Sequence, residues 1–393
     1  MTIFNEIKLA KELIKFPSVT PVDAGVMKFL EKKLKKLGFK TKIIEFKEKN
    51  FKPVKNLYAK IGKKGPNFCY AGHLDVVPPG NLTDWTVNPF KPSIKKGHLI
   101  GRGANDMKSS IAAFVSAVSA YLENNKNFDG SISLLITGDE EGDAINGTKK
   151  VVDYLKKKKE KINFCLVGEP TNPNKLGEMI KIGRRGSVNT TVTVEGIQGH
   201  VAYPHRAANP VPHLVQLLER LIAAKLDDGT PHFQPSNLEL TGFDVGNAVT
   251  NVIPALAQAR FNIRYNDIWN RDSITDWINE NLNTAHYALS ETIDGENKFS
   301  LSVDINHSGE AFLTPTGALS ELAVSAVEKT LGMTPELSTS GGTSDARFIK
   351  DHSRVIEFGL VGKTMHKVDE HVRVDDIRSL TNIYQEILSG YFS

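Results

Sequence analysis

Histidine and carboxylate side chains follow three apolar segments of the sequence. The first segment runs into Gly72-His73-Leu74-Asp75, the second into Asp139-Glu140-Glu141, and the third into Gly168-Glu169-Pro170. If the three segments are strands of one parallel sheet, their carboxyl ends lie at one edge, where open α/β sheets bind ligands. Imidazole nitrogen and carboxylate oxygen suit Zn²⁺, with Co²⁺ or Mn²⁺ as substitutes. The pattern therefore predicts a metal centre at this edge.

Two further segments carry side chains of the same kind. Asp106 lies in a glycine-rich stretch at residues 101–108, and His366 follows a glycine-bearing loop at 357–362. Each residue alone has an ordinary explanation, because an aspartate often caps a helix and a strand-end histidine often binds nothing. Five such segments in order favour the metal centre over these separate explanations.

The elements around these residues indicate an α/β domain. Continuously apolar runs at 68–71, 131–137 and 162–167 are typical of strands that are covered on both faces. Helical spacing at 107–122 and 147–156 separates them. This alternation predicts a mostly parallel sheet with helices on both faces.

A different pattern begins near residue 185 and ends near 308. Strands in this region alternate between apolar and polar residues, which indicates a sheet with one buried face. The expected strands are 188–194, 259–265 and 299–305, and the expected helices are 210–225 and 272–283. We therefore expect a smaller α+β domain of ferredoxin-like type at 185–308. It would interrupt a catalytic domain formed by 1–184 and 309–393.

Composition excludes several other functions. With 49 basic and 45 acidic residues, the net charge of +4 gives no footprint for nucleic acid. No apolar run approaches the ~18 residues of a membrane span, and charged residues interrupt the N-terminal stretch. Cys69 and Cys165 lie in apolar runs, so we expect buried thiols. These features predict a cytoplasmic protein without a nucleic-acid or membrane partner.

The ordered segments around the histidines and carboxylates resemble the successive motifs of the M20 metallopeptidase family. The resemblance implies two metal ions per chain, usually zinc, that Asp106 bridges. His73 and Glu169 would complete one position, and Glu141 and His366 would complete the other.

The same resemblance implies catalytic roles for two residues that are not ligands. Glu140 would be the general base, which takes a proton from metal-activated water and passes it to the leaving amine. Asp75 would accept a hydrogen bond from the second nitrogen of His73 and raise the basicity of that imidazole.

A motif in the inserted region resembles the dimerisation-domain motif of the family. It reads Gly196-Ile197-Gln198-Gly199-His200-Val201-Ala202-Tyr203-Pro204. The resemblance implies a homodimer through this domain, with His200 reaching the partner's active site to stabilise an oxyanion. A strand that ends in a turn also explains this glycine–histidine pair, and the sequence does not decide which subunit His200 serves.

Three more segments, at 183–187, 247–254 and 340–348, resemble the desuccinylase branch of the family. The small-molecule substrate of that branch, N-succinyl-LL-2,6-diaminopimelate, carries three carboxylates, which guanidinium forks and hydroxyl or backbone donors would bind. The contacts that the resemblance implies are Arg184, Ser187, Tyr203, Asn251, Arg264, Gly342 and Thr343.

Other functions stay open at this point. Another deacylase of the family, such as acetylornithine deacetylase, or a metallocarboxypeptidase would share the metal motifs, although the segment at 341–348 favours the desuccinylase. A metal-binding scaffold without activity is a third alternative. The presence of both Glu140 and Asp75 argues against that scaffold.

Overall fold

The computed structural model describes residues 3–62, 65–290, 292–293 and 296–393. The chain divides into two units. The large unit comprises Met1–Gly183, Thr314–Ser338 and Ser344–Ser393, and the small unit comprises Arg184–Leu313 and Thr339–Thr343. No helix within the described ranges is long and apolar enough to span a membrane.

An eight-stranded sheet forms the centre of the large unit, in the order β1-β2-β6-β3-β7-β20-β8-β19. The strands are β1 (Lys40–Phe46), β2 (Val54–Gly62), β3 (Asn67–His73), β6 (Ser131–Thr137), β7 (Phe164–Val167), β8 (Met179–Lys181), β19 (Glu336–Ser338) and β20 (Arg354–Glu357). The central strands β6, β3, β7 and β20 run parallel to one another. Every residue of β3 and β6 is buried, as their continuously apolar sequences predict. The carboxyl ends of these strands therefore lie at one edge.

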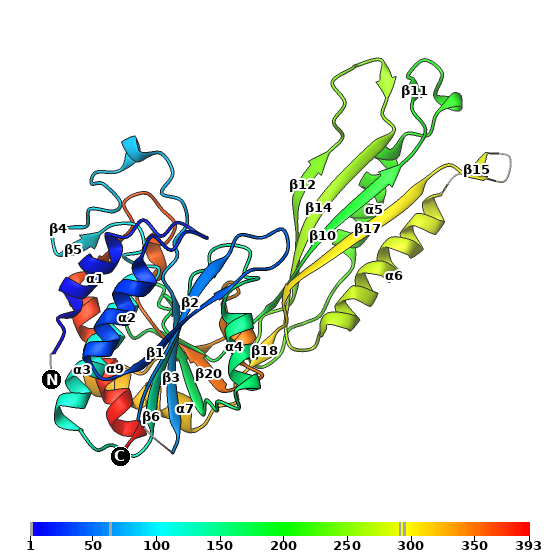
Figure 1. Ribbon diagram of the computed structural model, residues 1–393. Helices are drawn as coiled ribbons and strands as arrows, with labels where there is room; N and C mark the ends of the chain where they lie inside the picture. The colour runs from blue at the N-terminus through cyan, green and yellow to red at the C-terminus, as the bar shows by residue number, and fades with distance from the viewer. Residues whose placement is uncertain (1–2, 63–64, 291, 294–295) are drawn as a thin grey trace. The chain divides into compact units, whose positions relative to one another are not determined.

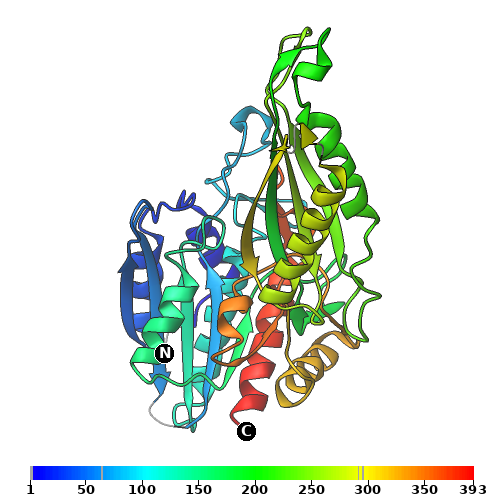
Figure 2. The same ribbon diagram turned by 90° about the vertical axis from the view of Figure 1, so that its right-hand side faces the viewer.

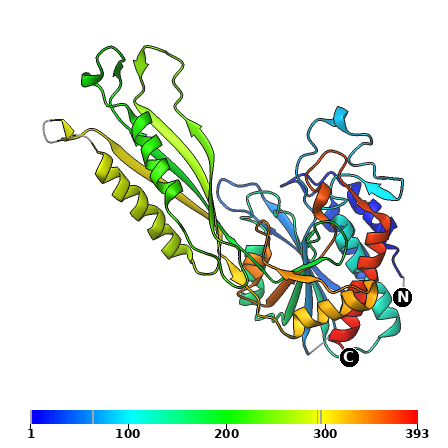
Figure 3. The same cartoon turned by 180° about the vertical axis from the view of Figure 1, so that it is seen from behind.

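Helices cover both faces of this sheet. They are α1 (Glu6–Ile14), α2 (Val26–Lys36), α3 (Lys108–Asn124), α4 (Thr148–Lys157), α7 (Ala318–Leu331), α8 (Ala346–Ile349) and α9 (Val374–Tyr391). Figure 1 shows α1, α2, α3 and α9 on one side of the sheet and α4 on the other. Figure 3 shows α7 beside α9, with which it packs. The predicted α/β class is confirmed.

An aromatic cluster joins the elements beneath the carboxyl edge. The ring of Tyr70 on β3 stacks on Phe114 of α3 at 4.2 Å between centroids, and Tyr384 of α9 meets both rings edge-on. The Ser110 hydroxyl lies 2.9 Å from the hydroxyls of both tyrosines, and the Tyr384 hydroxyl donates to the Phe358 carbonyl. The hydroxyls of Tyr70 and Tyr384 thus both have partners, which offsets the cost of burying them.

A small three-stranded sheet lies at the margin of the large unit, in the order β21-β5-β4. Its strands are β4 (Ser93–Lys95), β5 (His98–Ile100) and β21 (His371–Arg373). The single turns η1 (Leu82–Asp84) and η3 (Gly362–Thr364) lie in the neighbouring loops. In the antiparallel pairing of β21 with β5, His371 is opposite Ile100. This pairing brings the segment after residue 100 next to the segment before residue 371.

The small unit is an antiparallel sheet with two helices. The strand order is β12-β14-β10-β17. The main elements are β10 (Gly186–Glu195), β12 (Asn237–Asp244), β14 (Leu256–Tyr265), β17 (Ser300–Gly309), α5 (Pro210–Ala223) and α6 (Arg271–Leu289). Figures 1 and 2 show both helices on one face of the sheet. Alternate strand residues such as Val192 and Phe261 pack there against helical residues such as Leu217 and Ile278. The alternating strands thus have the one buried face that their sequences predict.

Shorter elements complete the chain. They are β9 (Gly183–Arg184), β11 (Gly199–His200), η2 (Pro204–Arg206), β13 (Val252–Ile253), β15 (Thr292–Ile293), β16 (Glu296–Asn297) and β18 (Phe312–Leu313). Strand β11 pairs with β13, with His200 opposite Val252.

Candidate metal centre

His73 is the last residue of β3, and its imidazole is buried. Its Nδ1 lies 2.9 Å from the backbone carbonyl oxygen of Asp75, which can only accept a hydrogen bond. Nδ1 therefore carries the proton in a neutral ring. Its Nε2 lies 3.0 Å from Asp106 Oδ1 and 3.7 Å from Glu169 Oε1. The nitrogen that is free to bind a metal thus faces two carboxylates.

The structure corrects the contact that we expect between the Asp75 carboxylate and His73. Asp75 Oδ1 lies 3.7 Å from Nδ1, too far for a hydrogen bond, and the backbone carbonyl of Asp75 takes that place. The carboxylate instead accepts the backbone N–H groups of Glu140 at 3.3 Å and Glu141 at 3.0 Å. The N–H of Leu74 donates to the carbonyl of Thr137 at the end of β6. Asp75 therefore lies beside the segment that follows β6, and its carboxylate faces the N–H groups of that segment.

Asp106 lies between two histidines. Its Oδ1 faces His73, and its Oδ2 lies 3.4 Å from Nε2 of His366. The same His366 nitrogen is 3.0 Å from Glu141 Oε1. Each oxygen of this buried carboxylate therefore faces a different imidazole, as a carboxylate that bridges two metal ions requires.

The structure brings all the predicted ligands of the large unit together. Ligand atoms of His73, Glu140 and Glu169 lie within 4.8 Å of one another, and so do those of His73, Asp106 and Glu141. The first group contains Glu140, to which we assign the role of base. Its separation from the coordination shell therefore stays a prediction.

The electrostatics of the cluster fit cations. Burial raises the pKa of Glu140 and of Glu169 well above the ordinary value, because each carboxylate loses water among like charges. Hydrogen bonds to Asp106 and Glu141 raise the pKa of His366 to about 10. The buried Oε1 of Glu169 has no hydrogen-bond partner among the described residues. A metal ion would satisfy that oxygen and offset the repulsion.

The pKa of His73 and of Asp106 shifts in opposite directions. Burial alone would lower the pKa of His73, but the bond to Asp106 and the charge of Glu169 raise it well above its usual range. Burial alone would raise the pKa of Asp106, but hydrogen bonds from His366 and His73 hold it well below its usual range. In the absence of an ion, the two imidazoles thus hold protons that balance the carboxylates.

The other predicted site residues belong to the small unit, where they form two groups. In the first, Ser187 on β10 is opposite Arg264 on β14, and Arg184 Nη1 donates to the Gly342 carbonyl oxygen at 3.0 Å. Thr343 follows Gly342 in the chain.

The second group lies around β11 and β13. The N–H of Val201 donates to the carbonyl of Asn251, and the rings of His200 and Tyr203 are 5.7 Å apart between centroids. Nδ1 of His200 accepts the N–H of Ala202 at 3.0 Å. This bond leaves Nε2 as the ring atom that is available to a ligand.

Two residues beside the site in the large unit are not predicted from the sequence. Arg102 and Glu370 form a buried ion pair at 2.7 Å next to Asp106, although 268 positions separate them in the chain. Glu370 stands four residues after His366, but no spacing or periodicity in the sequence signals its partner.

Comparison with known proteins places this geometry in a family. The model of Peptidase family M20/M25/M40 matches residues 69–390. A succinyl-diaminopimelate desuccinylase of Pelagibacter ubique is 60% identical to this chain over 392 residues, and the alignment covers 100% of both sequences. A Staphylococcus aureus tripeptidase has a TM-score of 0.78 at 18% identity, with 98% of each chain covered.

A Bacillus subtilis protein, described as a dinuclear metal binding peptidase from the M20 family, has a TM-score of 0.70 at 13% identity and covers 99% of this chain and 98% of its own. These structures share the fold of this chain. The family match and the full-length relative show more: the chain belongs to peptidase family M20/M25/M40.

Proposed function

We propose that this chain hydrolyses N-succinyl-LL-2,6-diaminopimelate to succinate and LL-2,6-diaminopimelate. The observation that carries this proposal is the 60% identity, along the whole chain, to a relative named succinyl-diaminopimelate desuccinylase. The two peptidases of known structure described above are only 18% and 13% identical and share the fold alone. The reaction would contribute diaminopimelate to lysine biosynthesis.

Two metal ions, with Zn²⁺ as the first choice, are part of this proposal. His73 and Glu169 would hold one ion, Glu141 and His366 would hold the other, and Asp106 would serve both. The donor set of two imidazoles and three carboxylates, without a thiolate, supports Zn²⁺. When bound, the ions would polarise the amide carbonyl and make water more acidic.

Glu140 would move the proton in this reaction. Its carboxylate would accept a proton from the attacking water and deliver it to the nitrogen of the leaving amine. Burial raises the pKa of Glu140, which makes it a stronger base than an exposed glutamate. Asp75 would support it by fixing the backbone of Glu140 and Glu141 through the two N–H groups that its carboxylate accepts.

Substrate carboxylates would bind to the small unit, which includes the segment at 339–343. Arg184, Ser187 and Arg264 offer charged or hydroxyl donors, and their positions on β9, β10 and β14 support one shared binding surface. The segment Gly342-Thr343 would add backbone and hydroxyl donors, while Tyr203 and Asn251 would act from the group around β11.

We further infer a homodimer through the small unit. Helix α5 and the edge strand β12 expose large apolar side chains: Val215, Ile222, Leu240 and Phe243 are each 44–55% exposed. These four, with Leu218, Glu219 and Ala223, line one mostly apolar hollow. An exposed apolar patch beside an unpaired strand edge favours association with a second copy about a twofold axis. His200 would then act on the partner's site.

Adding Zn²⁺ to protein stripped by a chelator should stabilise it and release protons. An ion at 100 times its Kd adds about 2.7 kcal/mol to the free energy of unfolding. The pKa of His366 is about 10 without an ion, so at pH 7.5 the incoming ion must displace its proton. The affinity for Zn²⁺ should therefore rise as the pH approaches the pKa of His366, about 10, by about tenfold per pH unit for each proton displaced.

Calorimetric titration in buffers of different ionisation enthalpy measures this proton release. Activity that survives complete removal of metal would contradict the two-metal proposal.

Substrate preference tests the function itself. We expect kcat/KM for N-succinyl-LL-2,6-diaminopimelate to exceed that for acetylornithine by orders of magnitude. Each buried donor that a poorer substrate leaves unpaired costs ~1–3 kcal/mol, and several such costs combine. Equal or better turnover of acetylornithine in a side-by-side assay would show that the branch is wrong.

A matched pair of variants sharpens this test. Arg264→Lys keeps the charge but removes the guanidinium fork, so kcat/KM for the succinylated substrate should fall. Arg260→Lys makes the same change on the same strand, four residues away, and should leave kcat/KM near its original value.

Mixing two inactive variants tests the shared site. His200→Ala and Glu140→Ala each disable every site of their own homodimers. If His200 acts on the partner's site, a mixed dimer has one site with both defects and one with neither. Random exchange makes half of the dimers mixed, so about a quarter of the original activity should return.

Subunit exchange must be followed independently, for example by energy transfer between labelled chains. Demonstrated exchange without any regain of activity would show that His200 acts within its own chain.

A further inference from the structure

The carboxylate of Glu370 accepts four hydrogen bonds. Its Oε1 accepts the backbone N–H groups of Asn105 at 2.8 Å and Asp106 at 3.0 Å. Its Oε2 accepts the N–H of Gly103 at 3.1 Å and Nη1 of Arg102 at 2.7 Å. The side chain is only 1% exposed. Because an ionised carboxylate only accepts hydrogen bonds, it suits a segment whose N–H groups converge on one point. The backbone that carries Asp106 is thus held around Glu370.

Arg102 connects the same carboxylate to the segment that carries His366. Its Nη1 also donates to the Lys367 carbonyl at 3.2 Å, and its Nη2 lies 3.5 Å from the carbonyl oxygen of His366. The guanidinium is buried and lies over the ring of Trp85. The planar guanidinium of Arg102 therefore holds the consecutive carbonyl groups of His366 and Lys367.

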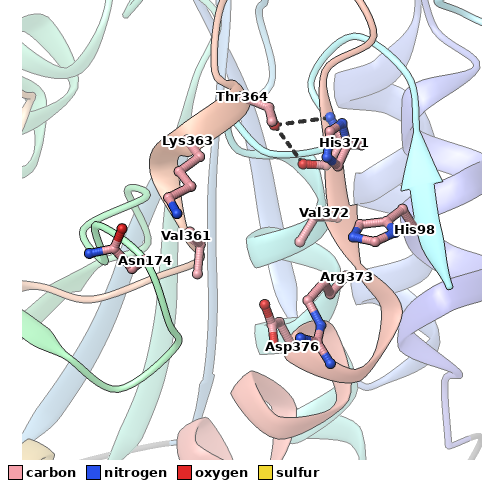
Figure 4. Close-up of a pocket in the computed structure, with 9 residues that line it drawn as sticks. All are labelled: His98, Asn174, Val361, Lys363, Thr364, His371, Val372, Arg373 and Asp376. Carbon is pink, nitrogen blue, oxygen red and sulfur yellow. Dashed lines mark hydrogen bonds between the residues drawn. The ribbon is translucent and has the colours of Figure 1, made fainter.

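The His366 segment is a loop that closes on itself. At its base the hydroxyl of Thr364 donates to the carbonyl oxygen of His371 at 2.6 Å and accepts the N–H of His371 at 3.1 Å (Figure 4). Within the loop, His366 and Asp369 have positive φ angles of 63° and 53°. Non-glycine residues adopt this conformation at a cost and keep it where contacts impose it. Contacts around the loop, those of Arg102 among them, therefore help to set the position of the His366 imidazole.

The two histidine neighbours of Asp106 are held in different ways. His73 ends a fully buried strand, so the central sheet fixes its position. His366 lies in a loop, and its side chain is 50% exposed. The distance between Asp106 Oδ2 and His366 therefore depends on what joins the loop to the segment at 103–106. Arg102 and Glu370 make that connection.

We propose that Arg102 and Glu370 are positioning residues, which hold Asp106 opposite His366 and so set the affinity of the metal position that Asp106, Glu141 and His366 form. This inference rests on the two-metal function proposed above. Asp106 would serve both ions, but only the position of Glu141 and His366 also depends on the loop, so the effect on the two ions should be unequal. A buried ion pair with a merely structural role would weaken folding without distinguishing the two positions.

The test compares metal binding by the full-length protein and three variants. Metal-free protein is titrated with Zn²⁺ in competition with a chromophoric chelator, which yields a Kd for each ion. Glu370→Gln replaces one acceptor oxygen by a donor and removes the negative charge that pairs with Arg102. Losing such support of a ligand costs about 10–100-fold in metal affinity, so we expect that loss for one of the two ions and a Kd within about threefold of the original for the other. Arg102→Lys should act in the same direction.

Glu31→Gln is the control. Glu31 is a buried carboxylate on α2 that pairs with Lys28 and Lys35, and it accepts a hydrogen bond from Thr41. Its loss should lower the thermal stability of the metal-free protein and leave both metal affinities unchanged. Thermal melting of each metal-free variant confirms folding, and Arg102→Lys provides the test if Glu370→Gln does not fold.

The outcomes separate the possible failures. If the original protein binds two ions and a folded Glu370→Gln or Arg102→Lys variant binds both with unchanged affinity, the positioning role is wrong and the proposed function stands. The positioning role is likewise wrong if Glu31→Gln weakens the binding of one ion to the same degree. If the original protein itself binds fewer than two ions, the two-metal function fails, and the positioning role fails with it.

Discussion

The concentration of buried negative charge at the carboxyl edge of one parallel sheet is the constraint on which the large unit depends. Asp75, Asp106, Glu140, Glu141 and Glu169 meet there with two imidazoles. Without cations this arrangement opposes folding, since buried carboxylates lose hydration and repel one another. In the absence of a metal, a protonated imidazole offsets part of this negative charge, which is why the pKa of His366 is raised.

The same kind of contact fixes the backbone of the acidic residues in two parts of the site. Asp75 accepts the N–H groups of Glu140 and Glu141, and Glu370 accepts those of the segment that carries Asp106. In each case a carboxylate outside the proposed ligand set fixes the backbone of one inside it. Backbone donors that bind such a carboxylate stabilise its charge and add no further negative charge to the cluster. The site can thus gather acidic ligands because other acidic residues organise them.

Much of this centre follows from sequence alone, for a physical reason. Strands that are covered on both faces read as unbroken apolar runs, so the ends of β3, β6 and β7 are visible in the sequence. Parallel pairing then requires those ends to meet. The alternating strands of the small unit are visible in the same way, because only one of their faces is buried.

Other features leave no comparable signal. Strand β12 is exposed along most of its length at the edge of its sheet, and its apolar alternation is limited to Leu238 and Leu240, before the register shifts between Leu240 and Gly242. Arg102 and Glu370 contact each other across 268 positions, and nothing local marks either of them. The partner of His73 Nδ1 is a backbone carbonyl, and every residue has one, so the residue type of Asp75 suggests the wrong acceptor.

Metal content and rate, measured together in Glu140→Gln, separate proton transfer from metal binding. We assign Glu140 to proton transfer and its neighbour Glu141 to metal, although Glu140 lies close enough to His73 and Glu169 to share their ion. A Glu140→Gln variant should therefore bind two ions and lose about 10²–10⁴-fold in single-turnover rate, whereas Glu141→Gln should lose an ion. Loss of an ion from Glu140→Gln would place Glu140 in the coordination shell and contradict this division of roles.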